Sequence, residues 1–594
     1  MPASFSVPRA ARPPLLALGL VIVAFVAWTY GALRAANDPG WQDTEPYLGH
    51  ALYVAEHGGP LAALRDAYAG RYPIVERHFL YPALLAPFAE RTPEFFVQAK
   101  LLNLAFGTAL LASLAWIAWR RFGAVPALVA TTLYAGSTSL VDASSHVNHE
   151  TQFALLALWT WCLLTARAET APASPGTPRD AGAARRRTFA WVAAGVLLGL
   201  AWLTKASAAL LGLGLLAAAL AYAGRGPLVT PRFWALVLCG ALVSSPLVVR
   251  NVIAHGTPVY EGMNSHISWM DSWDELGAAD SVLWYDQYGI KRIERNGLPT
   301  ASEYFGEKTA RQVAGRALRG VRSELTRVIP TALGPADPVP PGLSRASGGG
   351  LRLLAAAGWW LRRRSWEAAV TAGWTVAFVA FFSWNTLFEA HRYHAPLIPI
   401  GLMYAASALH AALARVASEV ALRRGAVLAA TSVAALATTH AVATEALTGP
   451  QPLVRASPAA WRLLDWMQRE ATPGSRLVIG PTQEFFGLLW LVDKPLQIVQ
   501  TPNSASRDEF FVYLEQRDVR YLVLHPENYR GQRGRLGDAL ANYVAVDARG
   551  EIRARAAPLG WETAVVDAGT PSRFVVYRAT RAMPAGALAA AGAR

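Results

Sequence analysis

Long runs of apolar residues recur over the first three quarters of the chain. A run of about 20 apolar residues is long enough to cross the hydrocarbon core of a bilayer as a helix. The runs therefore predict about eleven membrane-spanning helices. They cover residues 13–36, 99–119, 124–141, 150–167, 189–204, 206–223, 232–253, 346–361, 366–388, 393–412 and 425–443. The first run is too long for a cleaved signal peptide and has no small-residue cleavage site, so we interpret it as a retained helix.

The pattern changes after residue 450. Ser457-Pro458 is typical of an N-cap and a first helical turn, and predicts a helix that continues to about Ala471. Short apolar runs then predict strands, with a helix at 507–516 between two of them. The predicted strands cover residues 476–480, 496–500, 521–525, 561–567 and 574–577. Strands that alternate with helices indicate a small α/β domain with a partly parallel sheet.

The two patterns together predict a polytopic α-helical membrane protein with a small C-terminal α/β domain. We place the membrane domain at residues 1–445 and the soluble domain at 450–594. The composition agrees, because only 16% of the 594 residues are charged, whereas soluble proteins carry about 25%. Cys162 and Cys239 both lie inside apolar runs, which excludes a disulfide framework and a cysteine-based metal site.

The net charge of +14 comes almost entirely from arginine, with 50 Arg against five Lys, a ratio typical of a GC-rich bacterial genome. The arginines cluster in short connections that all fall on one side of an eleven-helix arrangement. These clusters are Arg9 and Arg12, Arg120 and Arg121, Arg185 to Arg187, Arg362 to Arg364, and Arg423 and Arg424. Such clusters mark the cytoplasmic side of a membrane protein, so no nucleic-acid partner is needed to explain the charge. We therefore expect a bacterial inner-membrane protein with a cytoplasmic N-terminus and a periplasmic C-terminal domain.

This arrangement places two long connections, 37–98 and 254–345, on the outer side together with the tail. In the second connection, residues 308–329 interleave arginines with apolar residues. That spacing predicts an amphipathic helix at the membrane interface, although an ordinary surface helix fits the spacing equally well.

Two carboxylates, Asp43 and Glu45, follow the first predicted membrane helix closely. Charges near a membrane face are costly, and they are commonly retained for a function. A carboxylate there could accept a proton from a hydroxyl group or hold a divalent cation. The alternative is that the pair simply begins a solvated loop.

A polar turn on the same predicted side contains Asp142, His146, His149 and Glu150. Two histidines and two acids within nine residues could serve a metal site or acid–base chemistry. The turn lacks the His-Glu-x-x-His spacing of many zinc enzymes, and a polar turn between helices accounts for it without any ligand.

Three cations are also expected on the outer side. Lys205 stands between two apolar runs, where it is either a point charge for a phosphate or a lysine that extends to the membrane surface. Arg250 ends the seventh predicted span, and Arg392-Tyr393 opens the tenth, against the usual sidedness of positive charge. Cations opposite an acidic pair suit a site for an anionic lipid, with an acid for an acceptor group and cations for a leaving phosphate.

Several short motifs resemble those of the GT-C superfamily of integral-membrane glycosyltransferases, over about residues 10–445. The similarity is to the bacterial branch that contains protein O-mannosyltransferases, aminoarabinose transferases of lipid A and galacturonic-acid transferases. The motifs are Asp43-Thr44-Glu45-Pro46-Tyr47, the Tyr81-Pro82 to Pro87 segment, Leu203-Thr204-Lys205, Pro246 to Asn251 followed by Gly256-Thr257-Pro258, and Arg392-Tyr393 followed by Pro396 and Pro399.

Two segments depart from the patterns of the superfamily. Arg77-His78-Phe79 stands where the family usually has His-Pro-Pro before the Tyr-Pro helix. Trp284 to Gly289 faintly echoes the Trp-Trp-Asp-Tyr-Gly element of oligosaccharyltransferases, but it lies in another region with an inserted residue, and we interpret it as a coincidence.

The resemblance implies transfer of a sugar, with inversion, from a polyprenyl-phosphate-linked donor to an envelope acceptor within reach of the membrane lipid. Asp43 matches the acid that acts as the base, and Glu45 is the second catalytic candidate. The expected donor-phosphate ligands are Lys205, Arg250 and Arg392. The sugar, acceptor or cation candidates are His146, His149, Glu150 and Tyr393. Glu45, His149 and Glu150 are the candidates for holding a divalent cation, should the reaction use one.

Two other functional classes fit parts of the sequence. A lipid-linked glycan polymerase or ligase also works at the outer face, but depends on outer-loop arginine and histidine rather than on an acid pair. A transporter is expected to contain internal repeats and charged or broken helices near the membrane midplane. No repeat is found in the sequence.

Overall fold

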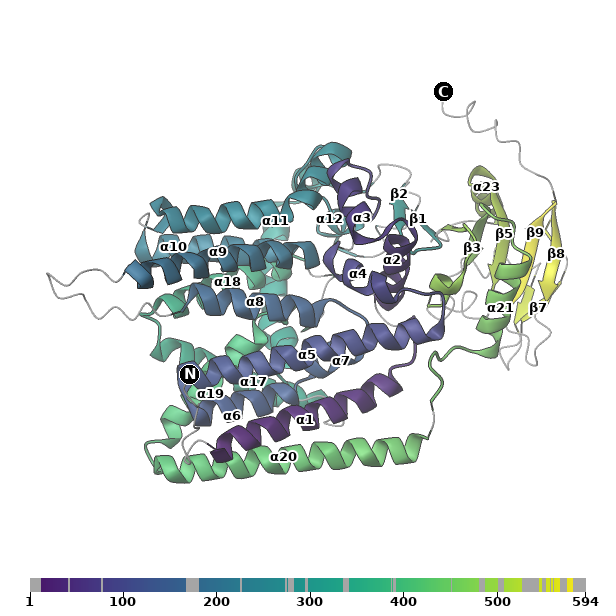
Figure 1. The fold of residues 1–594 in the computed structure, drawn as a ribbon. Coiled ribbons are helices and arrows are strands. Elements are labelled where there is room, and N and C mark those ends of the chain that lie inside the picture. The colour runs from purple at the N-terminus through teal and green to yellow at the C-terminus, as the bar shows by residue number, and fades with distance from the viewer. Residues whose placement is uncertain are drawn as a thin grey trace.

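The computed structural model describes residues 12–40, 43–75, 78–166, 181–224, 227–272, 275, 283–293, 298–334, 341–385, 387, 391–449, 451–479, 487–499, 507–525, 544–546, 552–555, 557–558, 560–566 and 574–580. These residues form a bundle of long helices and, at one end of it, a sheet domain. A group of short helices lies between the two (Figure 1).

Each of the eleven predicted spans overlaps a helix of the bundle. The helices are α1 (Arg12–Ala35), α5 (Pro93–Phe122), α6 (Ala124–Ala135), α8 (Glu150–Leu164), α9 (Ala181–Thr204), α10 (Ala208–Ala223), α11 (Pro231–His255), α17 (Pro341–Leu361), α18 (Trp366–Trp384), α19 (Ile398–Leu413) and α20 (Glu419–Thr448). Among the described residues, six helices are long and apolar enough to cross a membrane, and they belong to α1, α5, α9, α11, α18 and α20. Helices α6, α10 and α19 are shorter but also apolar.

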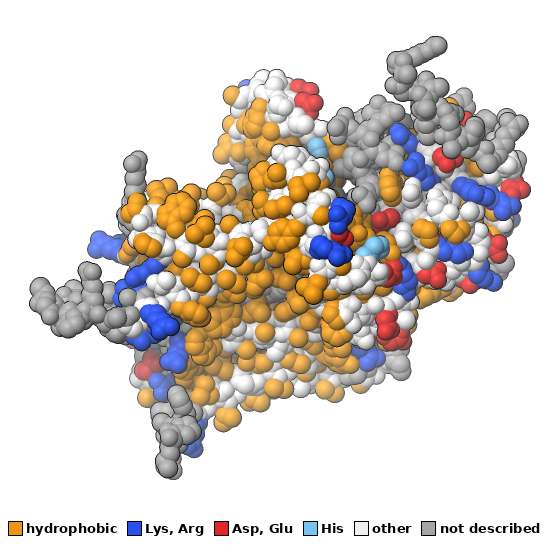
Figure 2. Space-filling model, turned by 45° about the horizontal axis from the view of Figure 1, so that its top comes forward, with side chains coloured by type: hydrophobic (Ala, Val, Ile, Leu, Met, Phe, Trp, Pro, Cys, Tyr) orange, Lys and Arg blue, Asp and Glu red, His pale blue; other side chains and the backbone are white. Residues whose placement is uncertain are grey.

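The surface of the bundle is apolar in the way a bilayer requires. Figure 2 shows hydrophobic side chains spread over the bundle, with lysines and arginines gathered at the end away from the sheet and mixed charges over the sheet domain. Large side chains such as Leu16, Leu242 and Leu436 are about 70% exposed, as lipid-facing residues are. The fold is therefore that of a polytopic α-helical membrane protein with a C-terminal α/β domain, as predicted.

The third predicted span, 124–141, is divided in the structure. Helix α6 ends at Ala135, and a second helix, α7 (Thr138–Ser145), begins after Ser137, whose side chain accepts a hydrogen bond from the backbone of Leu140. Ser137 has extended backbone angles and acts as an N-cap, so it starts a new helix where the apolar pattern predicted a continuous one.

The first long connection folds into short helices between the bundle and the sheet (Figure 1). They are α2 (Thr44–Glu56), α3 (Gly59–Tyr68) and α4 (Leu80–Leu85), the last followed by a 3-10 turn at Ala86–Phe88. Helix α2 is almost wholly enclosed, with Tyr47 and Leu48 buried, and it therefore serves as a fixed support for the residues around it.

The second long connection contains α12 (Met263–Ile267), the strands β1 (Leu283–Asp286) and β2 (Lys291–Ile293), and α14 (Ala301–Glu307). The helix predicted at 308–329 is present as α15 (Ala310–Ser323), which continues into a π-helical segment, η4 (Glu324–Val328), and then α16 (Ile329–Leu333). Leu318 and Val321 on α15 are exposed among its arginines, which keeps the prediction of an interfacial helix in place.

The tail folds nearly as its pattern predicts. It contains α21 (Pro458–Arg469), which Ser457 caps, α23 (Arg507–Gln516), and strands β3 (Arg476–Ile479), β4 (Gln497–Val499), β5 (Val519–Leu524), β8 (Trp561–Val566) and β9 (Val575–Ala579). Strands β6 (Val544–Val546) and β7 (Ile552–Ala554) form a separate two-stranded sheet. These two strands were not predicted from the sequence.

The main sheet joins the tail to the second long connection. Its strand order is β2-β1-β4-β3-β5-β9-β8, in which β4, β3 and β5 are parallel and the other pairings are antiparallel. Strand β1 pairs with β4, so that Trp284 lies opposite Val499. A hairpin from the connection at 254–345 thus extends the sheet of the tail and fixes the tail over the first-loop helices.

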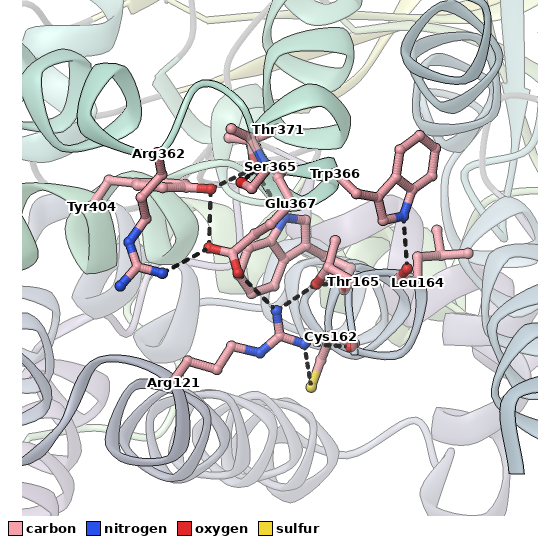
Figure 3. Close-up of polar contacts among 12 residues, drawn as sticks. Arg121, Cys162, Leu164, Thr165, Arg362, Ser365, Trp366, Glu367, Thr371 and Tyr404 are labelled. Atoms are coloured by element: carbon pink, nitrogen blue, oxygen red, sulfur yellow. Dashed lines mark hydrogen bonds and ion pairs between the residues drawn. The ribbon is translucent and has the colours of Figure 1, made fainter. Parts of the chain in front are cut away.

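A buried polar cluster holds the bundle at the end away from the sheet (Figure 3). The Glu367 carboxylate at the start of α18 accepts hydrogen bonds from Arg121 (3.3 Å) and Tyr404 (3.1 Å). Arg121 also donates to the Thr165 hydroxyl and to the carbonyl of Cys162, near the end of α8. The last carbonyls of a helix lack partners within it, so Arg121 both satisfies α8 and ties α5, α8, α18 and α19 together.

Small residues let two bundle helices touch directly. A Cβ atom added to Gly373 of α18 would lie 2.1 Å from the carbonyl oxygen of Gly214 on α10. Close backbone approach of this kind is a common basis of helix association in membranes, where apolar side chains gain little from leaving lipid.

We expect Gly373→Ala to destabilise the bundle by about 1–3 kcal/mol, because the added methyl forces α10 and α18 apart. Gly401→Ala on α19 is the matched control, since a Cβ there meets nothing within 4 Å. It should leave stability unchanged or raise it, because Ala favours helix over Gly. Thermal unfolding of the detergent-purified protein measures both. Equal melting temperatures for the two variants would contradict the close contact.

Candidate active site

Asp43 lies where the chain leaves α1 and enters α2. Lys100 of α5 donates to the carbonyls of Leu33 and Ala36 (2.8 and 2.9 Å), which satisfies the end of α1 and fixes the start of the connection. Asp43 occupies the N-cap position of α2, but its side chain makes no capping hydrogen bond. Its carboxylate instead lies 2.9 Å from the Arg392 guanidinium.

Arg392 stands between two carboxylates. Its Nη2 lies 2.9 Å from Asp43 Oδ2, and its Nε lies 3.8 Å from Glu150 Oε1. Burial lowers the pKa of Arg392, but the negative charges of Asp43 and Glu150 raise it by a larger amount. The pKa of Arg392 therefore lies above its usual value. Arg392 is therefore a permanent cation that bridges two residues, Asp43 and Glu150, which are distant from it and from each other in the chain.

Glu150 is the buried centre of the charges, with 1% of its surface exposed. It begins α8, where the helix dipole favours a negative side chain. Its Oε1 lies 3.0 Å from Lys205 Nζ, and its Oε2 lies 3.4 Å from His149 Nδ1. Glu150 thus holds two cations of the site, Lys205 and Arg392, at fixed positions.

Lys205 lies in the turn between α9 and α10, outside both helices. Burial lowers the pKa of Lys205, although the neighbouring Glu150 raises it in part. Its ammonium lies 4.4 Å from the centre of the Tyr393 ring, and Arg392 lies 5.2 Å from the same ring. Tyr393 stacks on Phe382 (5.1 Å between ring centres) and forms an aromatic wall beside both cations.

A second chain of polar contacts fixes His149. The Tyr47 hydroxyl on α2 hydrogen-bonds to its Nδ1, and the Tyr47 ring packs edge-on against Tyr81 of α4. The Tyr81 hydroxyl donates to Asn103 on α5 at 2.9 Å. The motif residues Tyr47 and Tyr81 therefore position the polar turn rather than forming a separate site.

Asn103 is a functional support that sequence reasoning did not select. It is fully buried, and its side-chain amide donates to the carbonyls of His146 and Asn148, with the Ala143 carbonyl 3.4 Å away, which closes the turn before Glu150. An asparagine inside an apolar helix is costly unless it has hydrogen-bond partners. A lone asparagine in the apolar run of α5 was therefore the sequence feature that could have indicated its role.

Three predicted site residues lie outside the charge cluster. Glu45 is buried against Gly289, because a Cβ added to Gly289 would lie 2.7 Å from the Glu45 Oε1. Residues two apart on a helix do not share a face, so Glu45 and Asp43 point in different directions. Arg250 donates to the carbonyl of Ile74 at 2.6 Å and so fixes the first connection. His146 pairs with Asp142 (3.4 Å), and burial lowers its pKa.

His146 also borders an open cleft. The cleft lies between the end of α1, the polar turn and the start of the tail, and it is lined by Ala35, Ala36, Asn37, Asp38, His146, Arg455, Ala456 and Ser457.

The donor set does not fit a divalent cation. Among the described residues, no three His, Cys, Asp or Glu side chains converge as metal ligands. Asp43 and Glu150 already face Arg392 and Lys205, so each carboxylate has a cationic partner, and Glu45 lies against Gly289. The cluster is suited to an anion that competes with the carboxylates for the cations.

Comparisons of the sequence with family models and with curated proteins find no match. Among solved structures, the chain is similar to ArnT from Cupriavidus metallidurans in the apo state, with a TM-score of 0.52 and 16% identity over 96% of this chain and 99% of that one. The same protein bound to undecaprenyl phosphate gives a TM-score of 0.51 and 16% identity, covering 94% and 97%. The chain therefore has the fold of ArnT.

The oligosaccharyltransferase of Archaeoglobus fulgidus, in a structure tethered to an acceptor peptide, is also similar. Its TM-score is 0.50 with 14% identity, and the match covers 91% of this chain and 74% of that one. At these identities the similarity establishes the fold, which the short motifs had predicted.

We expect Asn103→Leu to destabilise the protein strongly, because each buried carbonyl that loses its donor costs about 1–3 kcal/mol. Thr108→Val on the same helix is the control, since its hydroxyl only donates to Leu104 within α5. Thermal unfolding in detergent compares them. If Asn103→Leu and Thr108→Val had the same melting temperature, the turn before Glu150 would not depend on the Asn103 amide.

Proposed function

We propose that this protein is an inverting glycosyltransferase that moves a sugar from a polyprenyl-phosphate-linked donor to an envelope acceptor at the outer face of a bacterial inner membrane. One observation carries the proposal: Arg392 joins the carboxylate of Asp43 to the buried pair of Glu150 and Lys205. A base and phosphate-binding cations are thereby held side by side. The structure of ArnT with undecaprenyl phosphate supports a lipid phosphate as the ligand of this fold.

In this reaction Asp43 accepts the proton of an acceptor hydroxyl while the hydroxyl oxygen attacks C1 of the sugar. The bond between C1 and the phosphate oxygen breaks, and its electron pair remains on the phosphate. Arg392 and Lys205 neutralise the charge that develops there. Because Arg392 carries five N–H donors, it can contact the phosphate and retain a carboxylate partner.

The remaining polar residues have supporting roles. Glu150 positions Lys205 and Arg392, and Tyr393 supplies an apolar face beside the cations for the sugar. His149, held by Tyr47, faces the same cluster and is a ligand candidate for sugar or acceptor hydroxyls. Arg250 contributes by fixing the first connection at Ile74, and Glu45 by packing against Gly289 of the second connection.

We expect Asp43→Asn to abolish transfer, with a loss of about 10²–10⁴-fold, because an amide cannot accept the proton. The measurement is mass spectrometry of envelope lipids, glycans and proteins from cells that lack the gene and carry each variant. Asp465→Asn, an exposed change on α21, is the matched control and should restore the wild-type profile. Full transfer by Asp43→Asn would exclude this base. A changed polymer length without loss of one sugar would indicate a polymerase or ligase.

Affinity for undecaprenyl phosphate should fall as the pH rises, because Lys205 loses its proton below the usual lysine range. Burial lowers its pKa, and only the protonated form attracts phosphate. Lys205→Arg keeps its charge at all these pH values, so its affinity should remain constant over the same range. Titration of the purified protein with undecaprenyl phosphate from about pH 7 to pH 10 measures both. If the affinity of the wild type and that of Lys205→Arg changed with pH in the same way, loss of the Lys205 proton would not affect phosphate binding.

A further inference from the structure

A buried acid–histidine pair involves the turn that contains Arg392, which we call the Arg392 turn. His394 Nε2 is 2.6 Å from Glu324 Oε2, and their side chains are 1% and 5% exposed. His394 ends the 3-10 turn His391–His394, which also carries Arg392 and Tyr393. Glu324 belongs to the second long connection, 70 residues earlier in the chain. Burying two such groups is costly, and hydrophobic residues would often pack as well, so the pair calls for a functional explanation.

The backbone of the second connection places Glu324 next to this turn. Glu324 begins the π-helical segment η4, in which the amide of Ile329 bonds to the Glu324 carbonyl. Pro330 follows and has no N–H to give to the carbonyl of Thr326, so the ordinary helical pattern cannot continue there. Single turns of π-helix inside α-helices occur frequently at functional sites.

Helix α15, which precedes Glu324, is fixed to the end of α18. A Cβ on Gly320 would lie 1.7 Å from the Ser383 carbonyl oxygen, so the two backbones touch. Arg316 is buried and donates to the carbonyl of Trp384 (3.1 Å) and to Asp271 (3.1 Å). Helix α15 and the carboxylate that follows it therefore have a defined position relative to α18.

The Arg392 turn is held from two directions. Glu324 binds His394 on one side, and Phe382 of α18 packs on the other, stacked on Tyr393 and edge-on to His394 (5.5 Å). Within the turn, the Ala395 amide bonds to the Arg392 carbonyl, and the Leu397 amide bonds to the His394 carbonyl. A displacement of His394 would move the backbone of Arg392, and with it the guanidinium that meets Asp43 and Glu150.

We propose that Glu324 and His394 are a positioning pair, which sets the location of Arg392 and so couples the outer-loop helix α15 to phosphate binding. The proposal rests on the proposed function, because it assigns the pair to the phosphate ligand of that reaction. Neither residue contacts the reacting atoms, and their effect passes through Arg392.

A double-mutant cycle on binding of undecaprenyl phosphate tests the pair in the full-length purified protein. Arg392→Ala should weaken binding by at least about tenfold, since it removes a charged hydrogen-bond donor. Glu324→Ala should weaken binding to a similar extent. The double variant should bind no more weakly than Arg392→Ala alone, because the pair acts only through that residue. Glu307→Ala, an exposed change on α14 of the same connection, should bind like wild type.

Two further variants separate positioning from folding. Glu324→Gln keeps an oxygen that can accept from His394 Nε2, and His394→Gln offers an amide at the same reach. Each should keep most of the affinity that Glu324→Ala loses. If Glu324→Ala does not fold, His394→Ala takes its place in the cycle, because it removes the other partner of the pair.

The outcomes distinguish the two proposals. If Arg392→Ala weakened binding while the Glu324 variants only lowered the melting temperature, or if the losses were additive, the positioning role would be wrong and the proposed function would stand. If Arg392→Ala bound undecaprenyl phosphate like wild type, both the phosphate assignment and the positioning role would be wrong.

Discussion

The contact on which the site depends is the bridge that Arg392 makes between Asp43 and Glu150. Each carboxylate would be costly near a membrane without a cation, and the guanidinium would be equally costly without them. The bridge joins the start of α2, the start of α8 and the turn before α19, so the charges stabilise one another only when the whole bundle is assembled. An anion that enters this cluster meets cations already held in place, which reduces the reorganisation that binding requires.

The rest of the fold keeps that bridge in position. Asn103, Tyr81 and Tyr47 fix the turn before Glu150, and Lys100 closes the end of α1 ahead of Asp43. The polar cluster around Glu367 ties helices together at the opposite end of the bundle. Two polar networks at the two ends, with apolar packing and close glycine contacts between them, hold the helices of the bundle together.

The sheet domain shows how distant segments combine. The hairpin of β1 and β2 continues the sheet of the tail and ends in a turn whose Gly289 lies against Glu45. The segment from Trp284 to Gly289, interpreted from sequence as a coincidental motif, is therefore a structural link between the tail and α2. Strands β1 and β4 pair although their residues are more than 200 positions apart in the chain, and local sequence patterns carry no information about such a pairing.

The sequence by itself determined the helices, the strands of the tail other than β6 and β7, and the polar groups worth considering, because these follow from local periodicity and from charges in apolar surroundings. Asp43, Glu150, Lys205, His149 and Arg392 were found in this way, and the structure brings them together. The tertiary structure alone decided that Glu45, Arg250 and His146 contact Gly289, Ile74 and Asp142, that α6 and α7 are separate helices, and that β1 joins the tail. It also revealed Asn103 and the Glu324–His394 pair. The reason is physical: these results depend on which surfaces meet in the folded bundle, and that information is not local to any stretch of sequence.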